Sequence, residues 1–479
     1  MKTSFLFYTA LLALGLSACS LEETPPSALA PVNFYASAGD AQAAVNAVYD
    51  VANQIGDQSR NFIIMGDIPS DDMNLLLNNA DRIQIWSFQT IPTNGVVAQS
   101  WQVLYQGVNR ANTAIDRIPG IQMDENLKKR LIGEAKFMRA FYYFYLVRWW
   151  GGVPLMLSET RSLSDGREVK RATADEVYAQ VIKDLTDAEA ALPDRFTGAD
   201  LGRATAGSAK GLLAKVYLQR KDFANARAKA REVIDNAGKY GYGLFERYAD
   251  AFAIANKNGR ESVFEIQFLG QGTGQGSGMV TYFAPENSPV TGRGFGSFFP
   301  TTEFYNSFNP ADRRRELFIN SYVDGGGRTV NTFQHFNKYQ DPTARAFGDA
   351  NNNFPIVRYA DVLLMFAEAD NELNGPTPEA LSAANQVRRR AYGLPLNAPS
   401  AVDFAASLGK DGFRERLYDE RRWEFNAEGQ RWFDLVRTGR LVSVLKAKGK
   451  TNVEEKHNLF PIPQREIDLN PNLTQNPNY

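Results

Sequence analysis

The chain has 479 residues, with 53 Lys and Arg against 54 Asp and Glu, a formal net charge of -1 and 44% hydrophobic residues. This balance is typical of a folded globular protein; it excludes a disordered chain and lacks the positive excess of a nucleic-acid binder. The single cysteine and the two histidines, which lie far apart in the sequence, exclude an intrachain disulfide and a local zinc motif.

The N-terminus predicts a secretory signal peptide over residues 1–18. Lys2 precedes a short apolar run, and the small residues of Leu16-Ser17-Ala18 stand directly before Cys19. The apolar run is shorter than the roughly 20 residues that a membrane-spanning helix needs. The tripeptide and Cys19 resemble the lipobox of bacterial lipoproteins, in which the cysteine is diacylated; an ordinary signal-peptidase site beside a chance cysteine is the alternative. We therefore expect lipid at Cys19 to hold the protein at a membrane surface.

Residues 19–32 are predicted to be a flexible tether. They contain prolines and the acidic pair Glu22 and Glu23, and few side chains that could pack. Acidic residues directly after a lipidated cysteine resemble the surface-export signals of some Gram-negative lipoproteins. The tether is thus expected to present the folded body outside the cell.

Helical periodicity dominates the body from about residue 38 onward. Stripes from Ala41 to Val51 and from Trp101 to Ile115 are followed by helices predicted over about 124–150, 173–192, 206–220, 222–237, 356–374, 377–392 and 411–427. In the pair over 206–237, small residues and Tyr217 fall at the spacing of a tetratricopeptide repeat. The sequence therefore predicts a mainly α-helical, tetratricopeptide-repeat-like scaffold over about 33–260 and 354–440, within one domain of residues 33–479.

A loop-rich insertion with few strands is predicted over about 262–350. Ser262 to Phe268 alternates like a short strand, and runs of glycine follow that would prevent a helix. Loops of this kind on a rigid scaffold are where function is usually found. The prolines and Asn and Asp residues of about 456–479 predict a non-helical strap over the body.

No sequence pattern for catalysis stands out. The chain has no Gly-x-Ser-x-Gly nucleophile turn, no Gly-x-Gly-x-x-Gly after a strand and no calcium-loop spacing. A glycosidase needs two carboxylates at a defined separation in space, and nothing singles out such a pair among the 54 acidic residues. We predict no enzyme activity, no cofactor and no metal.

Four long segments carry a recognisable pattern. They read RAFYYFYLVRWWGGVPL from Arg139, NFPIVRYADVLLMFAEADNEL from Asn353, ERRWEFNAEGQRWFDLVRTGRL from Glu420, and LFPIPQREIDLNPNLTQNPNY from Leu459. These segments resemble the SusD/RagB family of outer-membrane nutrient-binding lipoproteins. With the lipobox, the similarity extends over essentially the whole chain.

The resemblance implies a SusD-like fold, lipid-anchored at the outer membrane and facing outward. It implies a lid on a SusC-like TonB-dependent transporter that captures oligosaccharides and performs no chemistry. An oligopeptide-binding lid is the nearest alternative, and a surface glycosidase or a periplasmic scaffold are further ones.

The four segments themselves are mostly scaffold. The aromatic run from Phe141 to Trp150 covers nearly all sides of its helix, which predicts burial. Arg416, Glu420 and Glu424 are spaced four apart, which favours ion pairs within and between helices. The family motifs therefore indicate the fold and leave the ligand site unmarked.

Ligand candidates come from the chemistry of sugars, whose apolar ring faces stack on aromatic side chains while their hydroxyls need planar polar partners. The stretches Asp71–Trp86 and Tyr282–Phe299 combine such groups on polar or Gly-rich segments. The candidate residues are Asp72, Arg82, Trp86, Tyr282, Phe283 and Phe298. The alternative is that Trp86 and the pair Phe298–Phe299 pack against the scaffold.

Overall fold

The computed structural model describes residues 34–55, 60–167, 169–286, 288 and 294–479. The predicted signal peptide and the whole predicted tether, including Cys19, lie outside the described residues. Over the rest, the prediction of a mainly α-helical fold with few strands is confirmed.

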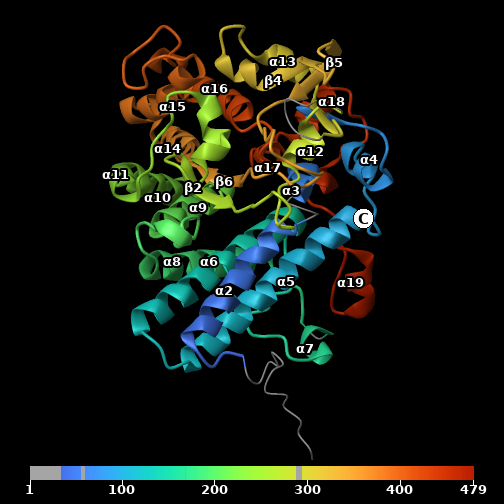
Figure 1. The fold of residues 1–479 in the computed structure, drawn as a ribbon, viewed down its shortest axis with the longest axis vertical. Helices are drawn as coiled ribbons and strands as arrows, with labels where there is room; N and C mark the ends of the chain where they lie inside the picture. The colour runs from blue at the N-terminus through green and yellow to red at the C-terminus, as the bar shows by residue number, and fades with distance from the viewer. Residues whose placement is uncertain (1–33, 56–59, 168, 287, 289–293) are drawn as a thin grey trace, which may run out of the picture.

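Antiparallel helices stack side by side to form the body (Figure 1). The long helices are α2 (Ala38–Asn53), α5 (Gly95–Arg117), α6 (Glu125–Trp150), α8 (Ala174–Ala191), α9 (Ala206–Gln219), α10 (Phe223–Asp235), α14 (Tyr359–Asn374), α15 (Pro378–Ala391) and α16 (Gly409–Glu424). Each predicted helix is therefore present to within a few residues, except α5. Its predicted stripe began at Trp101, whereas the helix begins at Gly95.

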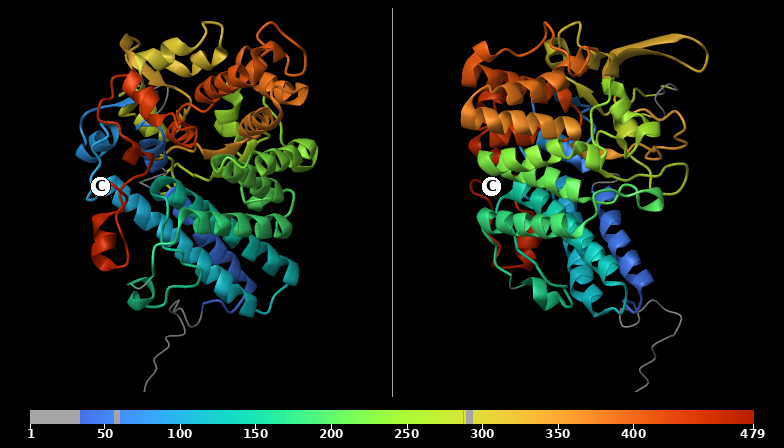
Figure 2. Two further views of the ribbon diagram at one scale, coloured as in Figure 1. Left: turned by 180° about the vertical axis from the view of Figure 1, so that it is seen from behind. Right: turned by 90° about the vertical axis from the view of Figure 1, so that its left-hand side faces the viewer.

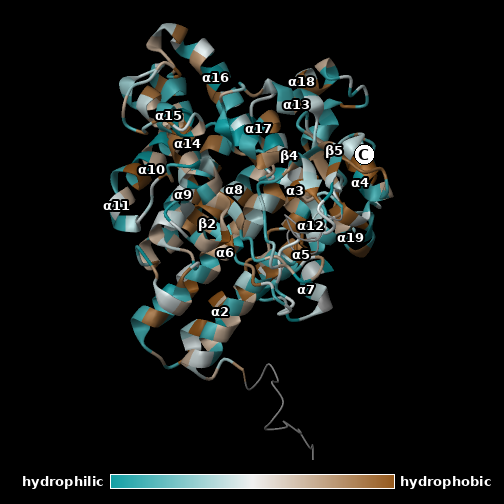
Figure 3. Cartoon of the chain, turned by 45° about the horizontal axis from the view of Figure 1, so that its top comes forward, coloured by the Kyte–Doolittle hydropathy of each residue, from teal (hydrophilic) through white to brown (hydrophobic). Residues whose placement is uncertain are grey.

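Short helices complete the body and the insertion. They are α3 (Arg60–Gly66), α4 (Ala80–Trp86), α7 (Leu163–Arg167), α11 (Ala237–Tyr240), α12 (Met279–Phe283), α13 (Thr302–Ser307), α17 (Arg431–Arg437), α18 (Leu441–Ala447) and α19 (Gln464–Leu469). The helices carry hydrophobic and hydrophilic bands along one ribbon, as amphipathic helices do (Figure 3).

Local signals set the helix ends. Ser37 and Thr173 each form a capping box with the acidic residue three positions on, which satisfies free N–H groups at the start of α2 and α8. Gly151 ends α6 at a φ of 73°, a left-handed conformation that favours glycine.

The strands of the described residues form three two-stranded antiparallel sheets: β1 (Met73–Leu75) with β3 (Phe298–Pro300), β2 (Ser262–Ile266) with β6 (Phe354–Arg358), and β4 (Phe318–Val323) with β5 (Thr329–Phe336). The predicted strand after Ser262 is present as β2. The β4–β5 hairpin projects from the helical stack (Figure 2, right).

Strand β6 corrects one boundary, because residues 356–358 were predicted to start a helix. Pro355 has no N–H for a helix, and the β-branched Ile356 and Val357 favour extended backbone. Pairing with β2 completes the strand, and α14 begins only at Tyr359.

The aromatic run of α6 forms the centre of the core, as predicted. Every aromatic side chain from Phe141 to Trp150 is 0–2% exposed. The Trp149 ring lies 5.1 Å from the Tyr145 ring and 6.0 Å from the Phe433 ring of α17. Helix α6 thus packs directly against α17, which is far from it in the sequence.

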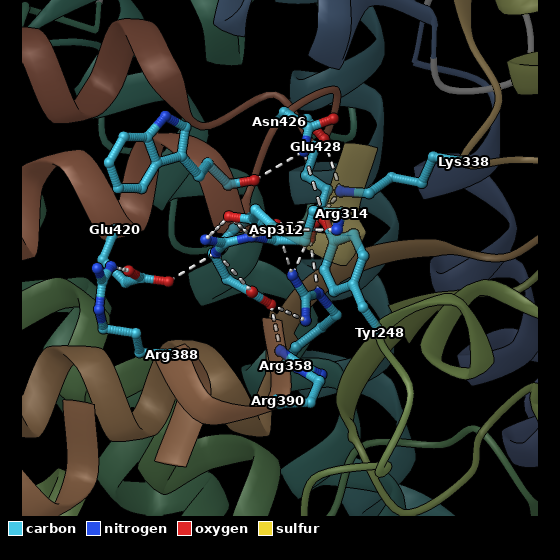
Figure 4. Close-up of polar contacts among 12 residues, drawn as sticks. Tyr248, Asp312, Arg314, Lys338, Arg358, Arg388, Arg390, Glu420, Asn426 and Glu428 are labelled. Carbon is cyan, nitrogen blue, oxygen red and sulfur yellow. Dashed lines mark hydrogen bonds and ion pairs between the residues drawn. The ribbon is translucent and has the colours of Figure 1, made fainter. Parts of the chain in front are cut away.

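A buried ion-pair network ties the insertion to the scaffold (Figure 4). Glu424 of α16 accepts from Arg358 of β6 at 2.9 Å, and Glu420 accepts from Arg314 of the insertion at 2.7 Å. Glu428 joins Lys338 and Arg358 at 2.6 and 2.8 Å. Alternating charges let these groups stay ionised in a medium of low dielectric constant.

The network confirms the expected ion pairs between helices, whereas the pairing of Arg416 with Glu420 within α16 is not found. Glu420 bonds Arg314 and Arg388, which belong to other elements, whereas Arg416 turns outward and lies 4.0 Å from Asp419. The pairs between elements prevail because Glu420 and Glu424 lie on the buried side of α16.

The C-terminal segment crosses the end of α6. Trp150 Nε1 donates to the Pro461 carbonyl at 2.9 Å, and Phe460 N donates to the Trp149 carbonyl at 2.7 Å. The segment was predicted to be non-helical, yet it contains the short helix α19, which follows Pro463. Proline suits a helix start because the first N–H groups of a helix have no partner within it.

None of the helices in the described ranges is long and apolar enough to span a membrane.

Candidate functional site

The two candidate stretches lie side by side, because β1 belongs to the first and β3 to the second. Met73 pairs with Pro300, Asn74 with Phe299, and Leu75 with Phe298. The Leu76 N–H extends the ladder to the Ser297 carbonyl at 2.9 Å. Segments more than 200 residues apart in sequence thus form one surface.

Strand alternation decides which side chains of this small sheet face outward. Leu75 and Phe298 are 5% and 0% exposed, whereas Asn74 and Phe299 between the buried positions are partly exposed. Successive side chains of a strand point to opposite faces, so Phe298 packs inward and its neighbour Phe299 points outward. The proposed alternative of packing against the scaffold therefore holds for Phe298 and not for Phe299.

Tyr282, Arg82 and Phe298 form one cluster. The Tyr282 and Phe298 rings stack at 5.4 Å, and the Arg82 guanidinium lies 5.7 and 5.6 Å from their centres. Arg60 donates to the Tyr282 hydroxyl at 3.0 Å. Tyr282 and Arg82 are half-buried, and Phe283 is 0% exposed and packs against Phe298. Phe283 and Phe298 consequently present no ring face to solvent.

Trp86 and Asp72 are each engaged by a basic residue. The Lys450 ammonium lies 4.7 Å from the Trp86 ring centre and donates to the Trp86 carbonyl at 3.1 Å, which covers part of this half-buried ring. Burial lowers the pKa of Lys450 to about 8. Asp72, 4% exposed, accepts from Arg422 at 2.6 Å. Its carboxylate is thus committed to an ion pair.

Four phenylalanines of the insertion form an exposed group that we call the aromatic surface: Phe295, Phe299, Phe333 and Phe347. Phe295 and Phe347 are 43% and 50% exposed and stack at 4.0 Å. Phe333, 48% exposed, lies 4.5 Å from Phe299. Exposed large rings that gather in this way are unusual on a soluble protein and mark binding sites.

His335 and Gly296 join the two ring pairs. His335 stacks on Phe333 at 4.3 Å, and a side chain at Gly296 would come within 2.8 Å of the His335 ring. Gly296 has a φ of 58° and directly follows Phe295. Glycine at this position therefore lets the Phe295 segment approach the β5 strand closely.

Polar side chains lie beside the aromatic surface. Asn74 shares the outer face of the β1–β3 pair with Phe299, and Asn331, two residues before Phe333, is exposed on the same face of β5. Arg345, two residues before Phe347, is exposed. Burial lowers the pKa of His335 to about 4, so its ring is neutral near pH 7.

Sequence reasoning missed Phe333 and Phe347. The alternation of Thr329–Phe336 contained a signal, because it places Phe333 on the face of Asn331. Phe347 precedes Gly348 in a turn that lies outside the two candidate stretches, and no comparable signal marks it.

Among the described residues, no group of three or more His, Cys, Asp and Glu side chains is placed to hold a metal ion. What the surface offers is apolar ring faces beside amide and guanidinium groups, a combination suited to reversible binding of sugars.

Comparison with known proteins shows which family this chain resembles. A model of the SusD family matches residues 318–479, and one described as starch-binding, associating with outer membrane, matches residues 21–218. SusD-like protein P2 of Formosa agariphila is 30% identical over 98% of this chain and 98% of its own.

Solved structures with a similar fold come from the same family. A laminarin-binding SusD-like protein is 28% identical with a TM-score of 0.80, covering 93% of this chain and 100% of that one. A SusD homolog from Bacteroides thetaiotaomicron is 26% identical with a TM-score of 0.84, covering 93% and 98%. Because its fold and nearly its whole length match these proteins, the chain belongs to the SusD/RagB family.

Proposed function

We propose that this protein captures oligosaccharides from outside the cell on its aromatic surface and performs no chemistry on them. The observation that carries the proposal is the exposed group Phe295, Phe299, Phe333 and Phe347 beside Asn74 and Asn331. Stacking supplies affinity for the apolar ring faces, and the amides supply partners for hydroxyls.

The comparisons support this assignment. One matched family model describes starch binding with association to the outer membrane, and a structure 28% identical to this chain binds laminarin. The uncharged ring of His335 beneath the aromatic surface favours a neutral glycan there. Arg82, Trp86 and Tyr282, which are half-buried beside β1 and β3, form its proposed edge.

We further propose that lipid at Cys19 tethers the protein to the outer membrane and that a SusC-like TonB-dependent transporter receives the glycan. Palmitate labelling of cells with native protein or Cys19→Ser tests the anchor. Affinity purification through a C-terminal tag, from detergent-solubilised outer membranes, tests the transporter. Loss of label with the variant and co-purification of a large β-barrel protein are expected; label on the variant, or recovery of the protein alone, contradicts them.

A glycan array and a peptide library, probed with the same purified protein, test the ligand class. Binding to neutral oligosaccharides such as laminari- or malto-oligosaccharides, with no peptide bound, is the expected result. Binding to peptides alone makes the protein an oligopeptide lid. A reducing-end assay on each bound glycan should stay flat, and release of reducing ends identifies a glycosidase.

A further inference from the structure

A pocket lies beside helix α9, formed by residues that are separate in sequence from those of the aromatic surface. Its volume is about 320 Å³, which falls in the range of small-molecule sites, ~300–1,000 Å³. Three segments line it: the α8–α9 connection, the turn after α11, and the residues that lead into β2. The lining includes Arg195, Thr205, Ser208, Tyr240, Tyr242 and Arg260.

Two arginines approach the same three-residue turn, Gly241-Tyr242-Gly243. The Arg195 guanidinium lies against Gly241, which has a φ of 79°, and the Arg260 guanidinium lies against Gly243. A side chain at Gly241 would collide with Arg195, and one at Gly243 would come within 3.0 Å of Arg260. Both arginines line the same pocket and both are exposed, so a ligand held in the pocket is accessible to their guanidinium groups.

These two positive charges are left without a partner, unlike the other charges of the pocket. Arg203 pairs with Glu134 at 3.0 Å, and Asp194 pairs with Lys239 at 3.0 Å. Glu265 is buried and accepts from Asn353 at 2.9 Å. Within the described ranges, neither the Arg195 nor the Arg260 guanidinium makes a hydrogen bond or an ion pair.

The rest of the lining suits a saccharide. The half-buried Tyr242 ring lies 5.6 Å from the Tyr240 ring, and its hydroxyl is 3.1 Å from the Thr205 hydroxyl. Rings and hydroxyl groups beside unpaired guanidinium groups offer stacking, hydrogen bonds and charge together.

We propose that this pocket binds the anionic group, carboxylate or sulfate ester, of an acidic oligosaccharide. A guanidinium can donate two parallel N–H bonds to such an oxyanion, and the second arginine of the pocket adds further donors and positive charge. The inference that the pocket binds an anion comes from Arg195 and Arg260 alone. The inference that the anion belongs to a saccharide rests on the proposed function. The site would let the protein hold an acidic sugar apart from the aromatic surface.

Isothermal titration at low salt tests the proposal with four probes: a trigalacturonate, a sulfated carrageenan tetrasaccharide, a neutral galacto-oligosaccharide and inorganic sulfate. The native protein should bind at least one acidic saccharide and should not bind inorganic sulfate, and any binding of the neutral probe, which belongs to the aromatic surface, should be the same with and without the two arginines. Arg195→Ala/Arg260→Ala should weaken that binding about tenfold or more, because hydrogen bonds to charged groups are lost. Which acidic probe binds distinguishes the carboxylate from the sulfate.

The matched control is Arg416→Ala, which removes an arginine that is 56% exposed on α16 and should leave the affinity unchanged. A charge-retaining variant, Arg195→Lys/Arg260→Lys, should recover only part of the affinity, since lysine lacks the planar fork. Unchanged affinity in the alanine variant, no binding of either acidic saccharide, or binding of sulfate alone overturns the proposal. Phe333→Ala/Phe347→Ala should still bind the acidic probe, so failure at the aromatic surface is recognised separately.

Discussion

The aromatic run of α6 and the aromatic surface of the insertion use the same kind of side chain for opposite purposes. The rings from Phe141 to Trp150 are 0–2% exposed, whereas Phe295, Phe333 and Phe347 are 43–50% exposed. The C-terminal part of helix α6 is buried by other elements, whereas the insertion carries a projecting hairpin and turns. Aromatic content alone therefore says little about binding; the elements around each ring determine its role.

The same contrast between a buried and an outward-facing ring occurs between adjacent residues of strand β3. Phe298 is buried and Phe299 points outward, although both precede Pro300 in the same short strand. A shift of one residue in the register of β3 against β1 would exchange them. The predictions that follow test this division between core rings and surface rings.

Removing a core ring should have the largest effect. Trp149→Ala empties a fully buried site and should lower the free energy of unfolding by about 3–5 kcal/mol. Phe333→Ala should change it by no more than about 0.5 kcal/mol. Urea denaturation followed by tryptophan fluorescence and circular dichroism measures both, and equal losses would contradict the division.

The neighbouring residues Phe298 and Phe299 offer the sharpest test of the division between core rings and surface rings. Phe298→Ala should cost about 3 kcal/mol of stability and leave the affinity of the folded protein for glycan unchanged. Phe299→Ala should leave stability within about 0.5 kcal/mol and weaken binding. Thermal unfolding and titration calorimetry on the two variants decide it, and a reversal of the two outcomes would mean that the strand register is different.

The charge network should make the scaffold sensitive to acid. Burial raises the pKa of Glu424, but the charges of Arg390, Arg358 and Arg314 prevail and lower it to about 2. A lowered folded-state pKa adds stability that is present above the unfolded value of about 4.3 and is lost as the pH falls toward 2, by up to roughly 3 kcal/mol.

Glu424→Gln should remove this part of the acid dependence and lower stability near pH 7. Urea titrations at several pH values between neutrality and pH 2.5 measure it. Glu415→Gln, on the same helix but 57% exposed, is the control and should behave as the native protein. Identical pH dependence in native protein and Glu424→Gln contradicts the assignment.

The proposed edge residues should matter less than the aromatic surface. Trp86→Ala/Tyr282→Ala should keep the fold and weaken glycan binding by less than about fivefold, because both rings are half-buried beneath Lys450 or Arg82. Calorimetry of the double variant measures this. A loss larger than that of Phe333→Ala/Phe347→Ala would move the site toward β1.

Binding of a neutral glycan should be independent of pH. The pKa of His335, lowered by burial to about 4, keeps that ring uncharged across pH 6 to 8. Titrations at both ends of this range should give the same affinity. A marked change would place a titrating group in contact with the sugar.

The helical fold could be predicted because each long helix carries its own apolar stripe and end signals, such as Ser37 and Gly151. Long-range pairing could not be predicted. The partner of β2 is β6, about 90 residues away, so β6 was taken for the start of a helix. Glu420 likewise finds Arg314 of the insertion in place of its neighbour Arg416.

The candidate site shows the same limit. Composition located the two stretches that β1 and β3 bring together, but the exposure of Phe299 and the burial of Phe298 depend on strand register. Phe347 contributes only because its turn lies beside Phe295. Such contacts arise from the three-dimensional fold and have no local signature in the sequence.

The most direct test of the central claim is calorimetric titration of Phe333→Ala/Phe347→Ala with the neutral oligosaccharide that the native protein binds best. Leu373→Ala, which removes an apolar side chain that is 46% exposed on the scaffold, is the matched control. The aromatic surface predicts a loss of affinity of about tenfold or more in the double phenylalanine variant, with unchanged thermal stability and native affinity in the control. Native affinity in the phenylalanine variant would contradict it.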